Sequence, residues 1–103
     1  MLRLASMMLL LTAAAAWAEP GATRARELTS LVRQDCGSCH GMTLKGGLGA
    51  PLLPETLDGK DAAGLATIIL DGLPGTPMPP WRGLLAESDA LWIARKLKEG
   101  FPQ

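Results

Sequence analysis

The sequence predicts a small all-α domain, and two observations carry that prediction. Apolar side chains recur at helical spacing in three stretches of the chain, residues 23–35, 58–71 and 84–99. The segments between these stretches are rich in glycine and proline, which disfavour regular structure. We therefore expect about three main helices joined by irregular loops.

The first helix is expected over residues 23–35, where Leu28, Leu31 and Val32 form an apolar stripe. Thr23 is a suitable N-cap, because a threonine hydroxyl accepts a hydrogen bond from a free backbone N–H of the first turn. The stripe would lay this helix against the last one.

The second and third helices end at glycines, Gly72 and Gly100, which suit a helix C-terminus. The buried face of the second helix is expected to hold Leu65, Ile68 and Ile69. The corresponding stripe of the last helix is Ala90, Ile93, Ala94 and Leu97.

The N-terminus has the layout of a secretory signal peptide. A basic start at residues 1–3 precedes a largely apolar run over residues 4–16, and Ala16-Trp17-Ala18 fits the small-x-small cleavage pattern. A retained membrane anchor is the alternative, but the run is shorter than the roughly 20 residues of a spanning helix. We expect residues 1–18 to be removed and residues 19–103 to form one exported domain.

The chemistry of the chain is concentrated in Cys-Gly-Ser-Cys-His at residues 36–40. On a helix, Cys36 and Cys39 lie on the same side, and His40 is the sole histidine. A disulfide here would close too short a loop to stabilise much. A zinc site needs four ligands where the chain has three Cys or His residues, and a thioredoxin-like pair expects a βαβ pattern. The motif is typical of covalent haem attachment.

The composition agrees with a cofactor in the core. The formal net charge is zero, so nothing indicates a nucleic-acid partner, and the chain has one Phe and no Tyr. Domains below roughly 100 residues struggle to bury enough apolar surface without a disulfide, metal or cofactor. We expect haem to complete the core and the haem-free protein to be poorly folded.

Residues 41–51 contain four glycines, which predict a loop whose backbone can approach a flat ligand closely. A phosphate-binding loop is the rival interpretation, but the Lys-Ser/Thr pair that opens its helix is missing.

Residues 72–81 surround Met78 with prolines, which make the segment stiff and extended. Haem iron in electron carriers takes histidine on one face and a thioether on the other. Only Met42 and Met78 remain after signal removal, and Met42 is tethered two residues past His40. We expect Met78 to be the distal ligand; Lys45, Lys60, a water molecule or an open site are the alternatives.

Together these features resemble the class I c-type cytochromes over nearly all of residues 19–103. Residues 31–53 and 72–81 are most similar to the small periplasmic cytochromes c-55X that accompany the cytochrome cd1 nitrite reductase of denitrifying bacteria. Two departures stand out: class I proteins often carry Gly where this chain has Leu28, and a capping Ser or Thr where it has Ala86. Neither position touches the iron.

The resemblance implies a class I cytochrome c fold, with the helices wrapped around one covalently bound haem c. Cys36 and Cys39 would attach the haem, and His40 and Met78 would hold the iron. In that family the carbonyl of the residue matching Pro51 accepts the other ring N–H of the haem histidine, which fixes its tautomer. Trp81 would lie near the haem rim or simply pack in the core.

The implied function is that of a monomeric periplasmic carrier of single electrons, which is not an enzyme and has no membrane span after signal cleavage. Its partner would be cytochrome cd1 nitrite reductase. Two alternatives are a role in maturing haem d1 of that reductase, and a peroxidase-type haem enzyme whose distal site is open.

Overall fold

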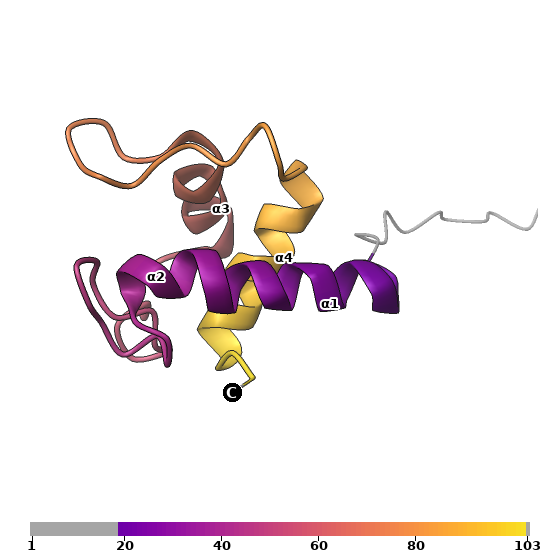
Figure 1. Cartoon of the computed structure of the whole chain (residues 1–103), viewed down its shortest axis with the longest axis horizontal. Helices are drawn as coiled ribbons and strands as arrows, with labels where there is room; N and C mark the ends of the chain where they lie inside the picture. Colours follow the sequence, from indigo (N-terminus) through magenta and orange to yellow (C-terminus); the bar gives the residue numbers. More distant parts are fainter. Residues whose placement is uncertain (1–18, 103) are drawn as a thin grey trace, which may run out of the picture.

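The computed structural model describes residues 19–102, so the expected signal peptide at residues 1–18 lies outside the described residues. The helical elements in chain order are α1 (Ala22–Leu31), η1 (Val32–Cys36), α2 (Gly37–His40), α3 (Ala62–Asp71) and α4 (Glu87–Glu99). The first three run on without a break as one long rod (Figure 1). Residues 19–102 contain no strand, and the prediction of an all-α domain with three main helices is confirmed.

The rod begins at Ala22 and not with Thr23 as its cap. Gly21 occupies the N-cap position without a side-chain hydrogen bond, and the Thr23 hydroxyl accepts a bond from Arg26 at 3.4 Å. The expected threonine cap is therefore wrong. Further along, η1 is a π-helical turn, closed by the N–H of Gly37 donating to the carbonyl of Val32. This wider turn rotates the residues that follow relative to a regular α-helix.

Helix α3 starts four residues later than expected, because the Asp61 carboxylate accepts the N–H of Gly64 and caps the helix there. It ends at Gly72 as predicted, where φ is +70°. The stripe of Leu65, Ile68 and Ile69 is only half-buried, whereas Ala66 and Leu70 are buried in the core.

Helix α4 starts at Glu87, after a turn in which the N–H groups of Leu84 and Leu85 donate to the carbonyl of Trp81. Ala86 has no side-chain oxygen to cap this helix, but the Asp89 carboxylate accepts the N–H of Ala86 at 2.9 Å. The same carboxylate forms a 2.8 Å ion pair with Arg24 of α1, which holds the pKa of Asp89 below its ordinary value. The residue therefore both caps α4 and ties it to α1.

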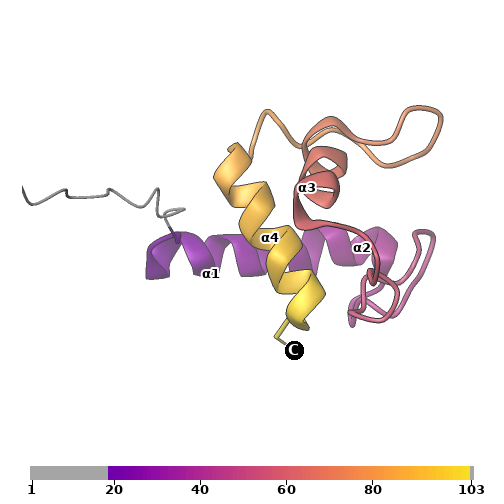
Figure 2. The same ribbon diagram turned by 180° about the vertical axis from the view of Figure 1, so that it is seen from behind.

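The core forms where α4 crosses the rod and packs against α3 (Figures 1 and 2). Leu28, Val32 and Ile93 are its most deeply buried large side chains, and the rings of Trp92 and Phe101 meet edge to face at 6.4 Å. The predicted α4 stripe (Ala90, Ile93, Ala94 and Leu97) is buried, so that prediction is confirmed. In the described residues, no helix is both long and apolar enough to cross a membrane.

Two loops lie at the α2 end of the rod, and both views agree on this placement (Figures 1 and 2). We call residues 41–54, which follow α2, the histidine loop. Residues 72–81, which follow α3, are the methionine loop. The residues expected to bind the cofactor lie in α2, at its boundary with η1, and in these two loops.

Candidate haem site

Cys36 and Cys39 lie at the junction of η1 and α2, where the helical backbone sets them three residues apart. Cys36 is half-buried, Cys39 is exposed, and both thiols are free. Burial, with a smaller contribution from the charge of Asp35, raises the pKa of the Cys36 thiol to about 11. Because neither thiol is in a disulfide, both cysteines are available for thioether bonds.

His40 ends α2, and the structure fixes which of its ring nitrogens carries the proton. Nδ1 lies 2.7 Å from the carbonyl oxygen of Ala50. Because a carbonyl oxygen only accepts, Nδ1 must donate the hydrogen, and Nε2 keeps a lone pair for a metal. A bond of this kind also makes the ligating nitrogen more basic.

This bond corrects the expected role of the Pro51 carbonyl. The acceptor is the carbonyl of Ala50, one residue earlier, while the Pro51 carbonyl accepts the hydroxyl of Thr56 at 2.9 Å. Proline still has a part, because it disfavours a helical conformation of the residue before it, Ala50. A backbone carbonyl therefore orients the histidine as expected, but it is the carbonyl of Ala50 and not that of Pro51.

Gly49 lies directly against the imidazole ring of His40. A Cβ at this position would come within 2.6 Å of ring atoms Cε1 and Nδ1. Gly47 approaches the chain equally closely, since a Cβ there would lie 2.7 Å from the carbonyl oxygen of Cys39. Only glycine fits at either position without displacing a neighbour, so the loop acts as a cradle for the histidine.

Leu44 anchors the histidine loop in the core. Its side chain is buried although its φ is +60°, a conformation that is a true outlier for a bulky residue. The carbonyl of Leu44 accepts the N–H of Leu52 at 2.9 Å, which closes the loop. Neither role carries a sequence signal, because leucine has no special preference for this backbone conformation.

Met78 is half-buried near the end of the methionine loop, and its carbonyl lies close to the backbone of Gly72 and Leu73. The N–H of Leu73 donates to it at 3.3 Å. A Cβ on Gly72 would lie 2.6 Å from the same oxygen, so glycine is required there for packing as well as for its positive φ. The Thr76 hydroxyl donates to the carbonyl of Leu73 and braces the turn.

The base of the methionine loop is closed by an ion pair that the sequence analysis missed. Arg82 Nε and Nη2 each lie 2.8 Å from Asp71 Oδ1. Beside this pair, the N–H groups of Trp81 and Arg82 donate to carbonyls at the end of α3. The loop therefore begins and ends at neighbouring points.

The other predicted residues are placed as follows. Trp81 is half-buried and packs against the core, and its place at the haem rim stays a prediction. Lys45 and Lys60, the alternative ligands, are both exposed. Met42 is 68% exposed, and its sulfur lies beside Gly37, 3.5 Å from where a Cβ on that residue would be.

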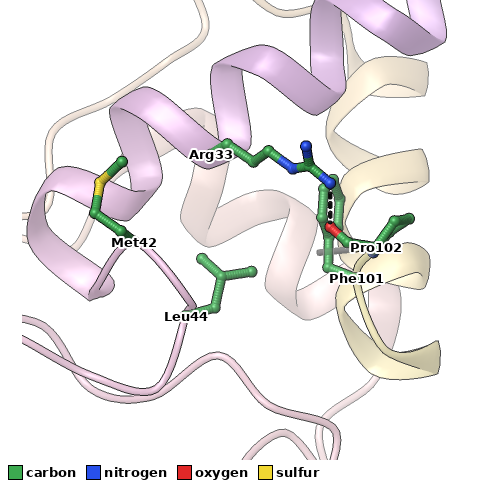
Figure 3. Close-up of a pocket in the computed structure, with 5 residues that line it drawn as sticks. All are labelled: Arg33, Met42, Leu44, Phe101 and Pro102. Atoms are coloured by element: carbon green, nitrogen blue, oxygen red, sulfur yellow. Dashed lines mark hydrogen bonds between the residues drawn. The ribbon is translucent and has the colours of Figure 1, made fainter.

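Met42 also lines a shallow cavity of about 200 Å³ with Arg33, Leu44, Phe101 and Pro102 (Figure 3). Here Arg33 donates to the carbonyl of Pro102 at 2.8 Å. A second cavity, of about 360 Å³, lies beside α3 and includes Leu65 and Ile68. Neither cavity includes His40 or Met78, and no cluster of three or more potential metal ligands occurs among residues 19–102.

The donor set fits a covalently attached haem. Two free thiols on one helical turn, an imidazole with a free Nε2, and a thioether on a separate loop are the groups that c-type attachment and His/Met ligation require. That Met78 and His40 face each other across the iron stays a prediction.

Comparison with known proteins gives a consistent result. The family model described as "Cytochrome C oxidase, cbb3-type, subunit III" matches residues 23–95. Cytochrome c55X of Paracoccus denitrificans (strain Pd 1222) is 54% identical over 94 residues, which cover 91% of this chain and 91% of that protein.

Two solved structures are also similar. The c-type cytochrome NirC superposes with a TM-score of 0.77 at 52% identity, covering 80% of this chain and 96% of that one. Dihydro-heme d1 dehydrogenase NirN, solved in complex with DHE, has a TM-score of 0.65 at 36% identity. That match covers 72% of this chain but 16% of the dehydrogenase chain.

Proposed function

This chain belongs to the c-type cytochromes, within the cytochrome c55X group, and we propose that it is a periplasmic monohaem carrier that donates single electrons to cytochrome cd1 nitrite reductase. The observation that carries the proposal is the 2.7 Å bond from His40 Nδ1 to Ala50, which leaves Nε2 free beside two free cysteines. Haem c, when bound, supplies an iron centre that changes by one electron between Fe(III) and Fe(II).

Some residues of the chain would attach the haem covalently, and others would bind its iron. Each cysteine thiol would add across a porphyrin vinyl group, so that an S–H bond breaks, S–C and C–H bonds form, and no oxidant is needed. His40 would supply an imidazole whose orientation Ala50 and Gly49 fix. Met78 would supply a soft thioether that favours Fe(II) and raises the reduction potential.

Two protein ligands leave no open position for a substrate, which suits a carrier rather than an enzyme. Two relatives that match 91% and 79% of this chain are cytochromes c55X. Export to the periplasm, by way of a signal peptide at residues 1–18, completes the proposal.

Electron donation is tested by mixing the reduced holoprotein with oxidised cytochrome cd1 nitrite reductase in a stopped-flow instrument. We expect the reductase to oxidise the cytochrome in a second-order reaction. Added nitrite reoxidises the reductase, so each reductase molecule should then oxidise many molecules of the cytochrome. A cytochrome that stays reduced in the presence of active reductase would contradict the proposal.

A second candidate function is a role in maturing the haem d1 of that reductase. The similarity of most of this chain to part of dihydro-heme d1 dehydrogenase favours it, because that protein acts on a dihydro-haem d1. A gene deletion distinguishes the two functions. Deleting the gene should leave the reductase fully loaded with haem d1 if the protein is only a donor, whereas a maturation factor would leave the reductase depleted.

A further inference from the structure

The rod carries a regular spacing that its burial does not follow. Leu28, Val32, Cys36 and Cys39 stand at positions i, i+4, i+8 and i+11. On an uninterrupted α-helix such positions form one stripe, because residues three and four apart are neighbours on the helix surface. Leu28 and Val32 are each 0% exposed in the core. A regular helix would therefore turn both thiols toward the side of the rod that packs in the core.

The burial of the rod instead continues one residue later than this spacing. Cys36 is half-buried, whereas the next residue, Gly37, is buried. Cys39 is exposed, whereas the next residue, His40, is half-buried. In each case the residue after the cysteine is the more buried of the two. The inward-facing stripe therefore runs from Val32 through Gly37 to His40, and both thiols lie off it.

The π-helical turn η1 accounts for this shift of one residue. The carbonyl of Val32 accepts the N–H of Gly37, five residues on, where an α-helix would use the N–H four residues on. The Ser38 hydroxyl donates to the carbonyl of Asp35 inside the turn at 2.7 Å, which helps to hold this form. Since an α-helix turns about 100° per residue, one extra residue rotates the following chain by about that angle relative to an uninterrupted helix.

We propose that η1 positions the haem-binding motif, by directing His40 inward and turning Cys36 and Cys39 off the core stripe. The inference rests on the proposed function, because it gives η1 a role in attaching haem c. Each thiol adds across a porphyrin vinyl group, so that an S–H bond breaks and S–C and C–H bonds form at the edge of the ring. The imidazole has to reach the iron at the centre of the ring. The two kinds of group must point in different directions, and the register of the rod decides which of them faces inward.

Changes in the length of η1 test this role. Deleting Gln34, an exposed residue of the turn, makes Gly37 the fourth residue after Val32. An ordinary α-helical turn can then form the same hydrogen bond and keep the same rotation of the motif. An alanine inserted between Gln34 and Asp35 would instead rotate the motif by about 100°. Gln34→Ala keeps the length of the turn and is the matched control.

The measurement is the number of thioether bonds in each full-length protein, produced under the conditions that give wild-type holoprotein. Acid extraction leaves covalently attached haem on the chain, and the reduced pyridine haemochrome spectrum distinguishes two thioether bonds from one. The Gln34 deletion and Gln34→Ala should both keep two thioether bonds at the wild-type yield. The insertion should lower the yield of doubly attached haem at least about 10-fold, because misplaced reacting groups lose most of their effective molarity.

A deletion protein that lacks either thioether bond, or an insertion protein that keeps both, would overturn the proposal. Leu28→Ala separates register from stability, because it removes a buried side chain one turn earlier without changing the length of the rod. Its unfolding midpoint should fall while both thioether bonds remain, and loss of a thioether bond in this variant would also overturn the proposal.

The proposed electron transfer is measured separately, by mixing the reduced wild type and the reduced deletion protein with cytochrome cd1 nitrite reductase. If the thioether bonds follow the expectation but neither protein passes electrons to the reductase, the role of η1 stands and the proposed acceptor is wrong.

Discussion

The histidine loop and the methionine loop each hold one proposed iron ligand, but they hold it by different means. The histidine loop is packed at separate points, with Leu44 buried in the core and Gly49 against the imidazole ring. The methionine loop is tied mainly at its base, by backbone hydrogen bonds and the exposed ion pair between Asp71 and Arg82. We infer that the histidine is the permanent ligand and that the methionine is the one that can be displaced.

The largest effect should come from the anchor of the histidine loop. Leu44→Ala removes a side chain that is 3% exposed, and truncating a buried leucine costs about 2–5 kcal/mol of unfolding free energy. Denaturant unfolding of the wild-type and variant holoproteins measures this loss of unfolding free energy. Leu48→Ala in the same loop is the control and should cost less than about 0.5 kcal/mol, because that side chain is already exposed. Similar losses in both variants would show that the loop is not anchored by Leu44.

Gly49→Ala should have the next largest effect, because its methyl group would lie 2.6 Å from the His40 ring. Overpacking of this kind costs about 1–3 kcal/mol, and we expect a lower yield of holoprotein with a displaced imidazole. The comparison is Gly83→Ala, where a Cβ meets nothing within 4 Å. The measurements are the holoprotein yield and the unfolding midpoint. A Gly49→Ala protein that matches the wild type in both would contradict the role of Gly49 in positioning the imidazole.

Much of this architecture follows from the sequence, and the parts that do not have physical causes. Stripes such as Ile93 and Leu97 locate the helices, because burial of one helical face depends on spacing alone. The starts of α3 and α4 depend instead on side-chain hydrogen bonds, which Asp61 and Asp89 provide. The π-helical turn η1 has no sequence signal.

The candidate site likewise has parts that the residue types predict and parts that depend on the folded loops. The motif at residues 36–40 and the proline-flanked Met78 were recognisable from residue types. The partner of His40 was misplaced by one peptide group, because the direction of the Ala50 carbonyl is a property of the folded loop. The pairing of Asp71 with Arg82 joins residues eleven apart that come together only when the loop closes.

The methionine loop should respond to a smaller change at its base. Asp71→Asn removes the charge that Arg82 pairs with, and the loop should then open more often. Exogenous imidazole competes for the position of Met78, so its affinity for the ferric holoprotein should rise about 2- to 5-fold, as for an exposed ion pair. Glu99→Gln, which breaks the exposed pair with Lys96, is the matched control and should leave imidazole binding unchanged.

The smallest effect concerns pH. The Arg82 guanidinium holds the pKa of the Asp71 carboxyl below its ordinary value. A lowered pKa means that the pair stabilises the closed loop above the ordinary carboxyl range and that this contribution is lost as the pH falls below about 4. Imidazole affinities of wild type and Asp71→Asn should therefore converge on acidification. A difference that persists or widens would exclude the ion pair as its cause.

The central claim is that His40 and Met78 hold one iron between two unequal loops. Its most direct measurement is the visible spectrum of the ferric holoprotein at neutral pH, recorded beside that of Met78→Ala. The account predicts that the wild type shows the weak long-wavelength band of methionine-ligated ferric haem and that Met78→Ala loses it while keeping its covalent haem. A wild type without the band, or a variant that retains it, would contradict the account.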